Sequence, residues 1–491
     1  MALSMRERIG AVTISAGATI REALRAIDRG ALGVALLVDA ESQAFTGLVT
    51  DGDLRRALLA GKGIEAPVAE VERPEPKVAR VGMSAEEVAS LFSEPVRAVP
   101  LLDDEGRVAD LALFDRRVRL PVTAPSLGEK ELLYVSECVL TGWVSSAGPF
   151  VERFEDLFAE FCGSEHAIAV SNGTAALHLA LLALGIGRGD EVIVPTLTFI
   201  ATANAVAYTG ARPVFVDSDP ETWTIDPVGI EAAVTPRTKA IVAVHVYGHP
   251  ADLEPILELA ARRGLAVVED AAEAHGARYR DRPVGALGDV GIFSFYGNKI
   301  VTTGEGGMVV TNRGDVAERV RLLRAHGMSP QRRYWHPVLG FNYRLTNLQA
   351  AIGVAQMERV EEILASKRRI ALLYADGLRD VPGITLPPEA KWASSVHWLY
   401  TVLVDERAFG LGRDELIAAL EAEDVETRPL FIPLHLQPLY DKAQRFPVAE
   451  RLAASGLSLP SAVGLGDDEV LRVVELVRAA SGAPAAAAPL P

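Results

Sequence analysis

The sequence has few cysteines, no long apolar run and no excess of basic residues. Its only cysteines, Cys138 and Cys162, lie outside any CxxC or Cys/His pattern, so a disulfide framework and a cysteine-based metal site are not expected. No uncharged apolar run reaches the ~20 residues that span a bilayer, and the first ten residues lack the apolar core of a signal peptide. With 49 basic and 65 acidic residues the net charge is −16, which disfavours nucleic acid and anionic membranes as partners. We therefore expect a cytoplasmic protein with no metal, membrane or nucleic-acid partner.

An internal repeat occupies residues 1–121. The apolar runs 35–39 and 45–50 are matched by 99–103 and 108–112, and Asp39 and Asp103 are 64 residues apart. Each copy is predicted to contain two short strands between helices, and the expected helices cover residues 18–29, 53–60 and 84–92.

Residues 122–375 follow a proline-containing linker and predict an α/β domain. Near-continuous apolar strands that alternate with helices indicate a mostly parallel sheet covered on both faces. Shorter mixed elements at 376–483 predict a small α+β domain, and the Ala/Pro-rich tail at 484–491 is expected to be disordered. The strands of the large domain are expected at 166–170, 191–194, 213–216, 240–245, 266–269, 290–295 and 307–311.

Four features follow four of these strands, at the sheet edge where ligands of parallel sheets bind. Ser171 to Leu177 open a helix whose first amides suit an anion, although an ordinary capped helix would look the same. Asp270 ends a strand and could face a ring nitrogen or simply cap a helix. Lys299 follows Phe293-Ser-Phe-Tyr-Gly-Asn and could attack an aldehyde, although a lone lysine is usually a solvated side chain. Phe199 could stack on a flat ring or pack in the core.

Together the four features describe one ligand, pyridoxal phosphate (PLP): a phosphate cradle, a stacking ring, an acid for the ring nitrogen and an amine for the aldehyde. At these residues the chain resembles the DegT/DnrJ/EryC1/StrS sugar aminotransferases, which have the PLP fold type I. The resemblance covers about 122–483. It rests on Gly142 to Ser146, Ser171 to Ala176, Phe199 to Asn204, Glu269 to Gly276, Phe293 to Lys299 and Gly340 to Asn347.

The resemblance implies roles for the cofactor residues. Lys299 would be the catalytic lysine that carries PLP and moves the substrate proton, and Asp270 would bind the pyridine nitrogen. Gly173, Thr174 and Ser294 would hold the phosphate, and Phe199 would stack on the ring.

Two further positions are implied by the resemblance. Asn342 would reach the cofactor phosphate of a neighbouring subunit, so a homodimer or higher homo-oligomer is expected. Glu273 stands where many members have Gln or His, near the phenolic oxygen of the cofactor. Two anionic oxygens would repel there, so Glu273 is expected to be protonated or turned away.

The expected reaction transfers an amino group from L-glutamate to a nucleotide-linked 4-keto-6-deoxy sugar. Glu273, Asn298-Lys299 and Tyr334-Trp-His336 are similar to those of perosamine synthases, which implies conversion of GDP-4-keto-6-deoxymannose to GDP-perosamine for O-antigen or lipopolysaccharide synthesis. A UDP- or dTDP-linked keto sugar is the alternative substrate. A sugar dehydratase of the same fold would have His in place of Lys299, and a PLP sensor without catalysis is the third alternative. The candidate sugar-binding residues, for which structural roles are equally compatible, are Trp143, Ser145, Ser146, Arg428 and His435, with Arg428 suited to the diphosphate.

The repeat at 1–121 resembles a tandem pair of CBS domains, through Gly47-Leu-Val-Thr-Asp-Gly-Asp-Leu-Arg-Arg56. The resemblance implies that Thr50 and Asp53 contact the ribose of an adenine nucleotide. In the second copy Leu113 stands where a threonine would be, so one nucleotide site is expected to be lost. Allosteric control of the transferase by an adenine nucleotide is one hypothesis, and a packing or oligomerisation module without a ligand is the other.

Overall fold

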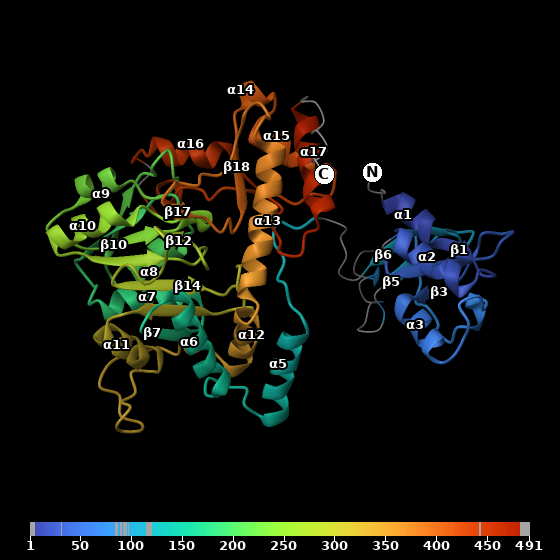
Figure 1. Ribbon diagram of the computed structural model, residues 1–491, viewed down its shortest axis with the longest axis horizontal. Helices are drawn as coiled ribbons and strands as arrows, with labels where there is room; N and C mark the ends of the chain where they lie inside the picture. Colours follow the sequence, from blue (N-terminus) through green and yellow to red (C-terminus); the bar gives the residue numbers. More distant parts are fainter. Residues whose placement is uncertain are drawn as a thin grey trace. The chain divides into compact units, whose positions relative to one another are not determined.

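The computed structural model forms two compact units, Met1–Arg119 and Leu120–Pro491, each described by itself below (Figure 1). It describes residues 5–30, 32–83, 87–88, 91, 96, 98–113, 120–440 and 443–481. Most of the helix expected at 84–92 and the whole tail 484–491 lie outside the described residues. None of the described helices is long and apolar enough to cross a membrane.

The first half of unit 1 is a three-stranded sheet with helices packed against it. Strand β2 is buried along its whole length, and Ile20, Ala23 and Ile27 give α2 an apolar stripe that packs in the same core. Thr50 caps α3 through a capping box with Asp53. The elements are α1 (Met5–Val12), β1 (Thr13–Ser15), α2 (Ile20–Gly30), β2 (Val34–Val38), β3 (Phe45–Thr50), α3 (Asp51–Leu59) and a 3-10 turn η1 (Val68–Glu70).

The second half of unit 1 repeats this sheet with β4 (Ala79–Arg80), β5 (Ala98–Leu102) and β6 (Val108–Leu113). In both sheets the first two strands are parallel and the last two antiparallel. Both hairpins also shift register at equivalent places, between Leu37 and Val38 and between Leu101 and Leu102. The same irregularity 64 residues apart confirms the internal repeat.

Unit 2 is built on a seven-stranded sheet in the order β7-β15-β14-β11-β10-β8-β9. Only β15 runs antiparallel to its neighbours, so the mostly parallel sheet is confirmed. Almost every strand residue is buried, because helices cover both faces. The strands are β7 (His166–Val170), β8 (Glu191–Pro195), β9 (Arg212–Val216), β10 (Thr238–Val244), β11 (Ala266–Asp270), β14 (Val290–Ser294) and β15 (Gly307–Thr311).

The helices of the large domain carry the apolar residues that fill its core. In the main cluster, Phe158 of α6 packs edge-to-face against Phe293 and Phe295, and Phe154 packs at a tilt against Phe295. The helices are α5 (Glu129–Thr141), α6 (Pro149–Cys162), α7 (Gly173–Ala183), α8 (Ala201–Tyr208), α9 (Pro227–Ala233), α10 (Leu253–Arg263), α11 (Gly314–Arg324) and α12 (Asn347–Met357), with a 3-10 turn η2 (Val246–Gly248). A small sheet joins β12 (Arg278–Tyr279), β13 (Arg282–Pro283) and β17 (Ala393–Ser394).

A second, smaller core lies toward the C-terminus, around the antiparallel sheet β16-β18-β20-β19. The long helix α13 (Val360–Leu378) belongs to both cores: Val360 and Ile363 pack in the large one, and Tyr374 and Leu378 in the small one (Figure 1). The remaining elements are β16 (Ile384–Thr385), β18 (Tyr400–Val404), α14 (Glu406–Phe409), α15 (Arg413–Ala422), β19 (Arg428–Pro429), η3 (Leu434–Leu436), α16 (Pro447–Ser455), β20 (Gly456–Leu459) and α17 (Asp467–Ala480).

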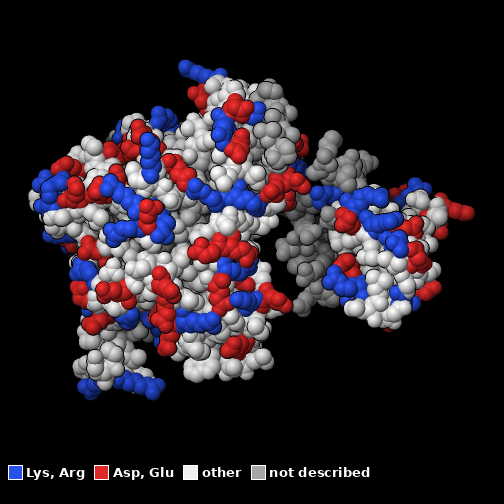
Figure 2. Space-filling model, in the orientation of Figure 1, with Lys and Arg blue, Asp and Glu red and all other residues white. Residues whose placement is uncertain are grey.

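The surface carries both signs of charge. On the face of unit 2 that Figure 2 shows, basic and acidic side chains are interspersed over the helices. Charged side chains of this unit also form ion pairs with one another, as Arg153 and Lys130 do with Glu358. Interspersed charges of this kind do not attract a polyanion as a single-sign field would.

Candidate active site

A cavity of about 630 Å³ lies where several strands of the large sheet end. The segments that follow β7, β8, β11 and β14 all contribute to its wall, and β19 and the segment before β18 close it from the small-domain side. Eight residues predicted for cofactor or substrate line it: Gly173, Thr174, Phe199, Asp270, Glu273, Ser294, Lys299 and Arg428.

The N-terminus of α7 forms one side of the cavity. The Asn172 side chain caps the helix by accepting a hydrogen bond from the Ala175 amide at 2.8 Å, which leaves the amides of Gly173 and Thr174 without an intrahelical acceptor. A Cβ at position 173 would lie 2.8 Å from Cβ of Ser294, so only glycine allows this approach. Two free amides and two hydroxyls beside a positive helix end suit a phosphate group.

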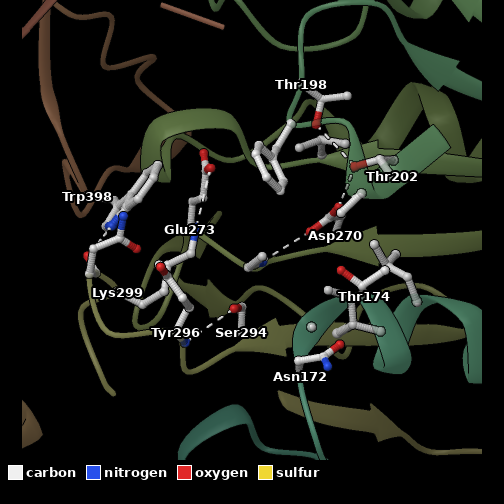
Figure 3. A pocket seen from close by; sticks show the side chains of 18 of the residues that line it. Asn172, Thr174, Thr198, Thr202, Asp270, Glu273, Ser294, Tyr296, Lys299 and Trp398 are labelled. Atoms are coloured by element: carbon white, nitrogen blue, oxygen red, sulfur yellow. Dashed lines mark hydrogen bonds and ion pairs between the residues drawn. The ribbon is translucent and has the colours of Figure 1, made fainter. Parts of the chain in front are cut away.

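Asp270 lies at the end of β11, beside Thr202, and Lys299 lies on the other side of the view (Figure 3). Its carboxylate accepts hydrogen bonds from the Thr202 hydroxyl at 2.8 Å and from the Ala272 amide at 3.2 Å. Burial raises the pKa of Asp270, although both hydrogen bonds and the charge of Lys299 oppose the shift. A protonated ring nitrogen would supply the cation that such a buried carboxylate lacks.

Lys299 follows β14 through a tight turn closed by its own amide and the Tyr296 carbonyl. Its Nζ lies 3.5 Å from Oε1 of Glu273 and 3.7 Å from the centre of the Trp398 ring (Figure 3). Burial lowers the pKa of the Lys299 amine, while Glu273 and Asp270 oppose the shift. A desolvated lysine with a lowered pKa is the form that attacks an aldehyde near neutral pH.

Glu273 points into the cavity and is not turned away. Its Oε2 accepts a hydrogen bond from the Tyr247 amide at 2.8 Å, and its Oε1 faces Lys299. Burial raises the pKa of Glu273, and the neighbouring Asp270 adds to the shift while Lys299 and the Tyr247 amide oppose it. Of the two states expected for this carboxyl group, the geometry rules out the one in which it is turned away from the cavity.

Phe199 and Arg428 lie at the accessible part of the cavity. Phe199 is 56 % exposed and its ring centre lies 5.8 Å from that of Phe431. The ring therefore lies outside the hydrophobic core. Arg428 is held loosely by Glu426 at 3.5 Å and is also half-exposed, which leaves its guanidinium available to an anion.

Five residues predicted for cofactor or substrate are not part of the cavity wall: Trp143, Ser145, Ser146, Asn342 and His435. Trp143 and Ser145 are exposed and Ser146 is half-buried, and their segment is fastened to Asn347, which donates to the Trp143 carbonyl and to the Ser145 carbonyl. Asn342 is exposed and its backbone pairs with Ala325.

His435 requires a correction. It is completely buried, with Nδ1 2.7 Å from the Thr196 hydroxyl and Nε2 3.1 Å from the Glu450 carboxylate. Because both ring nitrogens are already bonded within the chain, His435 is removed from the candidate sugar-binding residues. It links the segment after β8 to α16.

Three residues that the sequence did not single out complete the cavity. Thr202 orients Asp270, the Tyr247 amide orients Glu273, and Trp398 lies under Lys299. Thr202 lies within the motif Phe199 to Asn204, so position alone could have identified it. Tyr247 and Trp398 belong to segments with no recognisable pattern.

In unit 1, Thr50 and Asp53 bond mainly to each other. The Asp53 carboxylate accepts from the amide and the hydroxyl of Thr50 at 2.8 and 2.7 Å, and it pairs with Arg56 at 2.5 Å. Asp53 is almost fully buried. The pair therefore has a structural role as the cap of α3, whether or not it also contacts a ligand.

The cavity fits PLP on chemical grounds. It offers an anion cradle at α7, a buried carboxylate in need of a cation, and a desolvated lysine in the same cavity. The volume lies within the range of about 300–1,000 Å³ that small-molecule sites occupy.

Comparison with known proteins places this arrangement in a family. The DegT/DnrJ/EryC1/StrS aminotransferase family model matches residues 125–478, and the CBS domain model matches residues 5–60. The chain is 52 % identical to the GDP-perosamine synthase of Caulobacter vibrioides over 72 % of its own length and 96 % of that protein. It is 47 % identical to the GDP-perosamine synthase of Escherichia coli O157:H7, over 73 % and 97 %.

A solved structure has the same fold as this chain over most of unit 2. DesV of S. venezuelae, determined with a ketimine intermediate, superimposes with a TM-score of 0.67 at 42 % identity, covering 72 % of this chain and 94 % of that one. The predicted family, fold class and cofactor are thereby confirmed. The chain belongs to the DegT/DnrJ/EryC1/StrS family of PLP-dependent aminotransferases and carries a CBS domain pair at its N-terminus.

Proposed function

We propose that this enzyme transfers the amino group of L-glutamate to the keto carbon of GDP-4-keto-6-deoxymannose, yielding 2-oxoglutarate and GDP-perosamine. The observation that carries the proposal is the convergence of Lys299, Asp270 and the α7 N-terminus on one cavity. The identity of the sugar is supported by the two relatives named GDP-perosamine synthase, each matched over nearly its whole length.

Each residue of the cavity has a separate task in this proposal. PLP, when bound, supplies an aldehyde that carries the amino group and a ring that accepts electrons from the substrate carbon. Lys299 holds the cofactor covalently and, once displaced by the amino donor, takes the proton from Cα with its Nζ and returns it. Asp270 keeps the ring nitrogen protonated, and Thr202 and the Ala272 amide hold the carboxylate in place.

The remaining contacts position the cofactor and the sugar nucleotide. The amides of Gly173 and Thr174, with Ser294, bind the phosphate, and Phe199 stacks on the ring. Glu273, protonated, donates to the phenolic oxygen of the cofactor. Arg428, at the accessible part of the cavity, binds the diphosphate of the sugar nucleotide, because a guanidinium matches phosphate oxygens in pairs.

The test is a two-step assay on the full chain. Glutamate alone should convert the absorbance band of the lysine-bound cofactor to that of its amine form, and adding the keto sugar should restore the first band and release an amino sugar seen by mass spectrometry. Keto sugars linked to GDP, UDP and dTDP are compared at equal concentration. Lys299→Ala should show neither change, whereas the exposed Lys239→Ala should behave as wild type. An unchanged band with glutamate would contradict transamination, and faster turnover with UDP or dTDP would change the substrate.

We also propose that the enzyme acts as a homodimer with shared active sites. Asn342 is exposed and outside its own cavity, and α5 exposes Leu132, Leu133 and Leu140 by 61–86 %. Apolar side chains in this number on one helix suit burial against a second copy. Light scattering should give twice the chain mass, and mixing Lys299→Ala with Asn342→Ala chains should restore activity through hybrid sites; a monomer, or no restoration, would contradict the proposal.

For the N-terminal unit we propose binding of an adenine nucleotide near Thr50 and Asp53, with an effect on turnover. The CBS model match and the position of both residues at the start of α3 support it. AMP or ATP should raise the melting temperature of the full chain and change kcat. Equal values with and without nucleotide would favour a packing module instead.

The product defines the class of the next reaction. A nucleoside diphosphate is a leaving group, so an amino sugar linked to GDP is suited to a glycosyl transfer. We propose that this transfer serves O-antigen or lipopolysaccharide synthesis and that the enzyme works in the cytoplasm.

A further inference from the structure

Trp398 is held in place on all sides. Its amide donates to the Tyr247 carbonyl at 3.0 Å, its carbonyl accepts from Nζ of Lys367 at 2.8 Å, and its indole N–H donates to the Asn298 carbonyl at 2.8 Å. Its ring stacks nearly parallel to that of Tyr247, with centres 6.2 Å apart, and only 5 % of the residue is exposed. The ring has little freedom to turn away from the cavity.

The face of this ring lies under the amine of Lys299. The distance of 3.7 Å from Nζ to the ring centre is well inside the ~6 Å within which a cation is attracted to an indole. The charged and titratable groups that act on Lys299 are Glu273, Asp270 and the buried His275. Burial raises the pKa of both carboxyl groups. The attraction of the indole face for the Lys299 ammonium, by contrast, does not depend on whether either carboxyl group is charged.

We propose that Trp398 is a positioning residue that holds the free, protonated side chain of Lys299 while it is detached from the cofactor. The proposal rests on the proposed function, in which Nζ takes the proton of the substrate Cα and becomes an ammonium inside a water-poor cavity. An aromatic face stabilises that cation, keeps Nζ within the cavity and lets it return the proton. The Asn298 hydrogen bond fixes the lysine-bearing turn over the same ring.

The test measures the pKa of Lys299 itself. The full chain, freed of cofactor, and the holoenzyme after glutamate treatment are labelled with acetic anhydride across a pH series, and acetylation of the Lys299 peptide is quantified by mass spectrometry. Trp398→Leu removes the ring face and should lower this pKa by about one unit, whereas Trp398→Phe keeps a face and should shift it less. Trp392→Phe, which changes a tryptophan outside the cavity wall, should leave it unchanged.

Fluorinated tryptophan provides a test that does not depend on folding of the leucine variant. Each added fluorine weakens the negative face of the ring with little change in shape, so the pKa of Lys299 should fall stepwise with the number of fluorines. A pKa that is unchanged by fluorination and by Trp398→Leu would overturn the proposal. If glutamate fails to release the lysine, the cofactor-free measurement still decides the role of Trp398, so this failure is distinguishable from failure of the proposed function.

Discussion

Replacing Asp270 with asparagine should nearly abolish amino transfer while leaving the fold intact. The substitution keeps the size and shape of a side chain that is only 5 % exposed, but it removes the negative charge that the proposed ring nitrogen requires. Removing one partner of a buried charge pair costs about 3–5 kcal/mol. At about 1.4 kcal/mol for each factor of ten in rate, kcat/KM should fall by about 10²- to 10⁴-fold.

Although Asp270→Asn should lower activity, it should not lower the stability of the cofactor-free chain. Burial raises the pKa of Asp270 above its unfolded value, so its contribution to stability is present at low pH and is lost as pH rises through the folded pKa. The asparagine variant escapes this loss, so at neutral pH its melting temperature should equal or exceed that of wild type.

The assay measures both the rate of amino transfer and the thermal stability of the variant. Single-turnover absorbance with glutamate gives the rate, and thermal unfolding between pH 4 and pH 8 gives the stability. Thr202→Val, which removes one hydrogen bond to the carboxylate but keeps its charge, is the matched control and should lose far less activity. A rate loss below tenfold in Asp270→Asn, with a cofactor that still binds, would refute the assignment of Asp270 to the ring nitrogen.

Two further predictions concern the anion cradle at the start of α7 and the long helix α13. Gly173→Ala places a Cβ 2.8 Å from Cβ of Ser294 and should weaken cofactor binding at least tenfold in a titration of the cofactor-free chain, whereas Gly187→Ala, whose Cβ meets only the Thr209 carbonyl at 3.9 Å, should not. Burial lowers the pKa of Lys367 on α13 to about 7, so between pH 7 and the unfolded value of about 10.4 the unfolded chain binds more protons and stability rises with pH. Lys367→Met should flatten this rise in melting temperature; an identical pH profile in wild type and variant would contradict the assignment.

The large sheet could be predicted because its strands are continuous apolar runs between helices. The strands at 166–170 and 307–311 match the prediction, and the others differ by one or two residues at their ends. The strand expected from 240 begins at Thr238, which pairs with Glu191 across a register shift that the apolar pattern does not show. The small-domain sheet was beyond prediction, because β16 and β19 have two residues each and show no periodicity.

The predicted cofactor residues of the cavity share one property: each ends or follows a strand of the large sheet, within a motif. Trp398 lies about a hundred residues from Lys299 in the sequence, and Tyr247 adopts a left-handed backbone with φ of 54° for which a tyrosine gives no local signal. His435 illustrates the reverse case: it was a candidate sugar-binding residue, and both of its ring nitrogens are bonded within the chain, to Thr196 and Glu450.

The charges of the cavity explain why one more cation completes it. Lys299 is one positive group among two carboxyl groups, and its Nζ lies nearest to Glu273. Asp270 is left with hydrogen bonds from Thr202 and Ala272 only, which do not offset the cost of burying its charge. A protonated ring nitrogen at Asp270 would balance that charge and free Lys299 to exchange its proton. Burial raises the pKa of Glu273. In its protonated form this carboxyl group would add no charge beside the cofactor and would still donate a hydrogen bond, as the Gln or His of other members does.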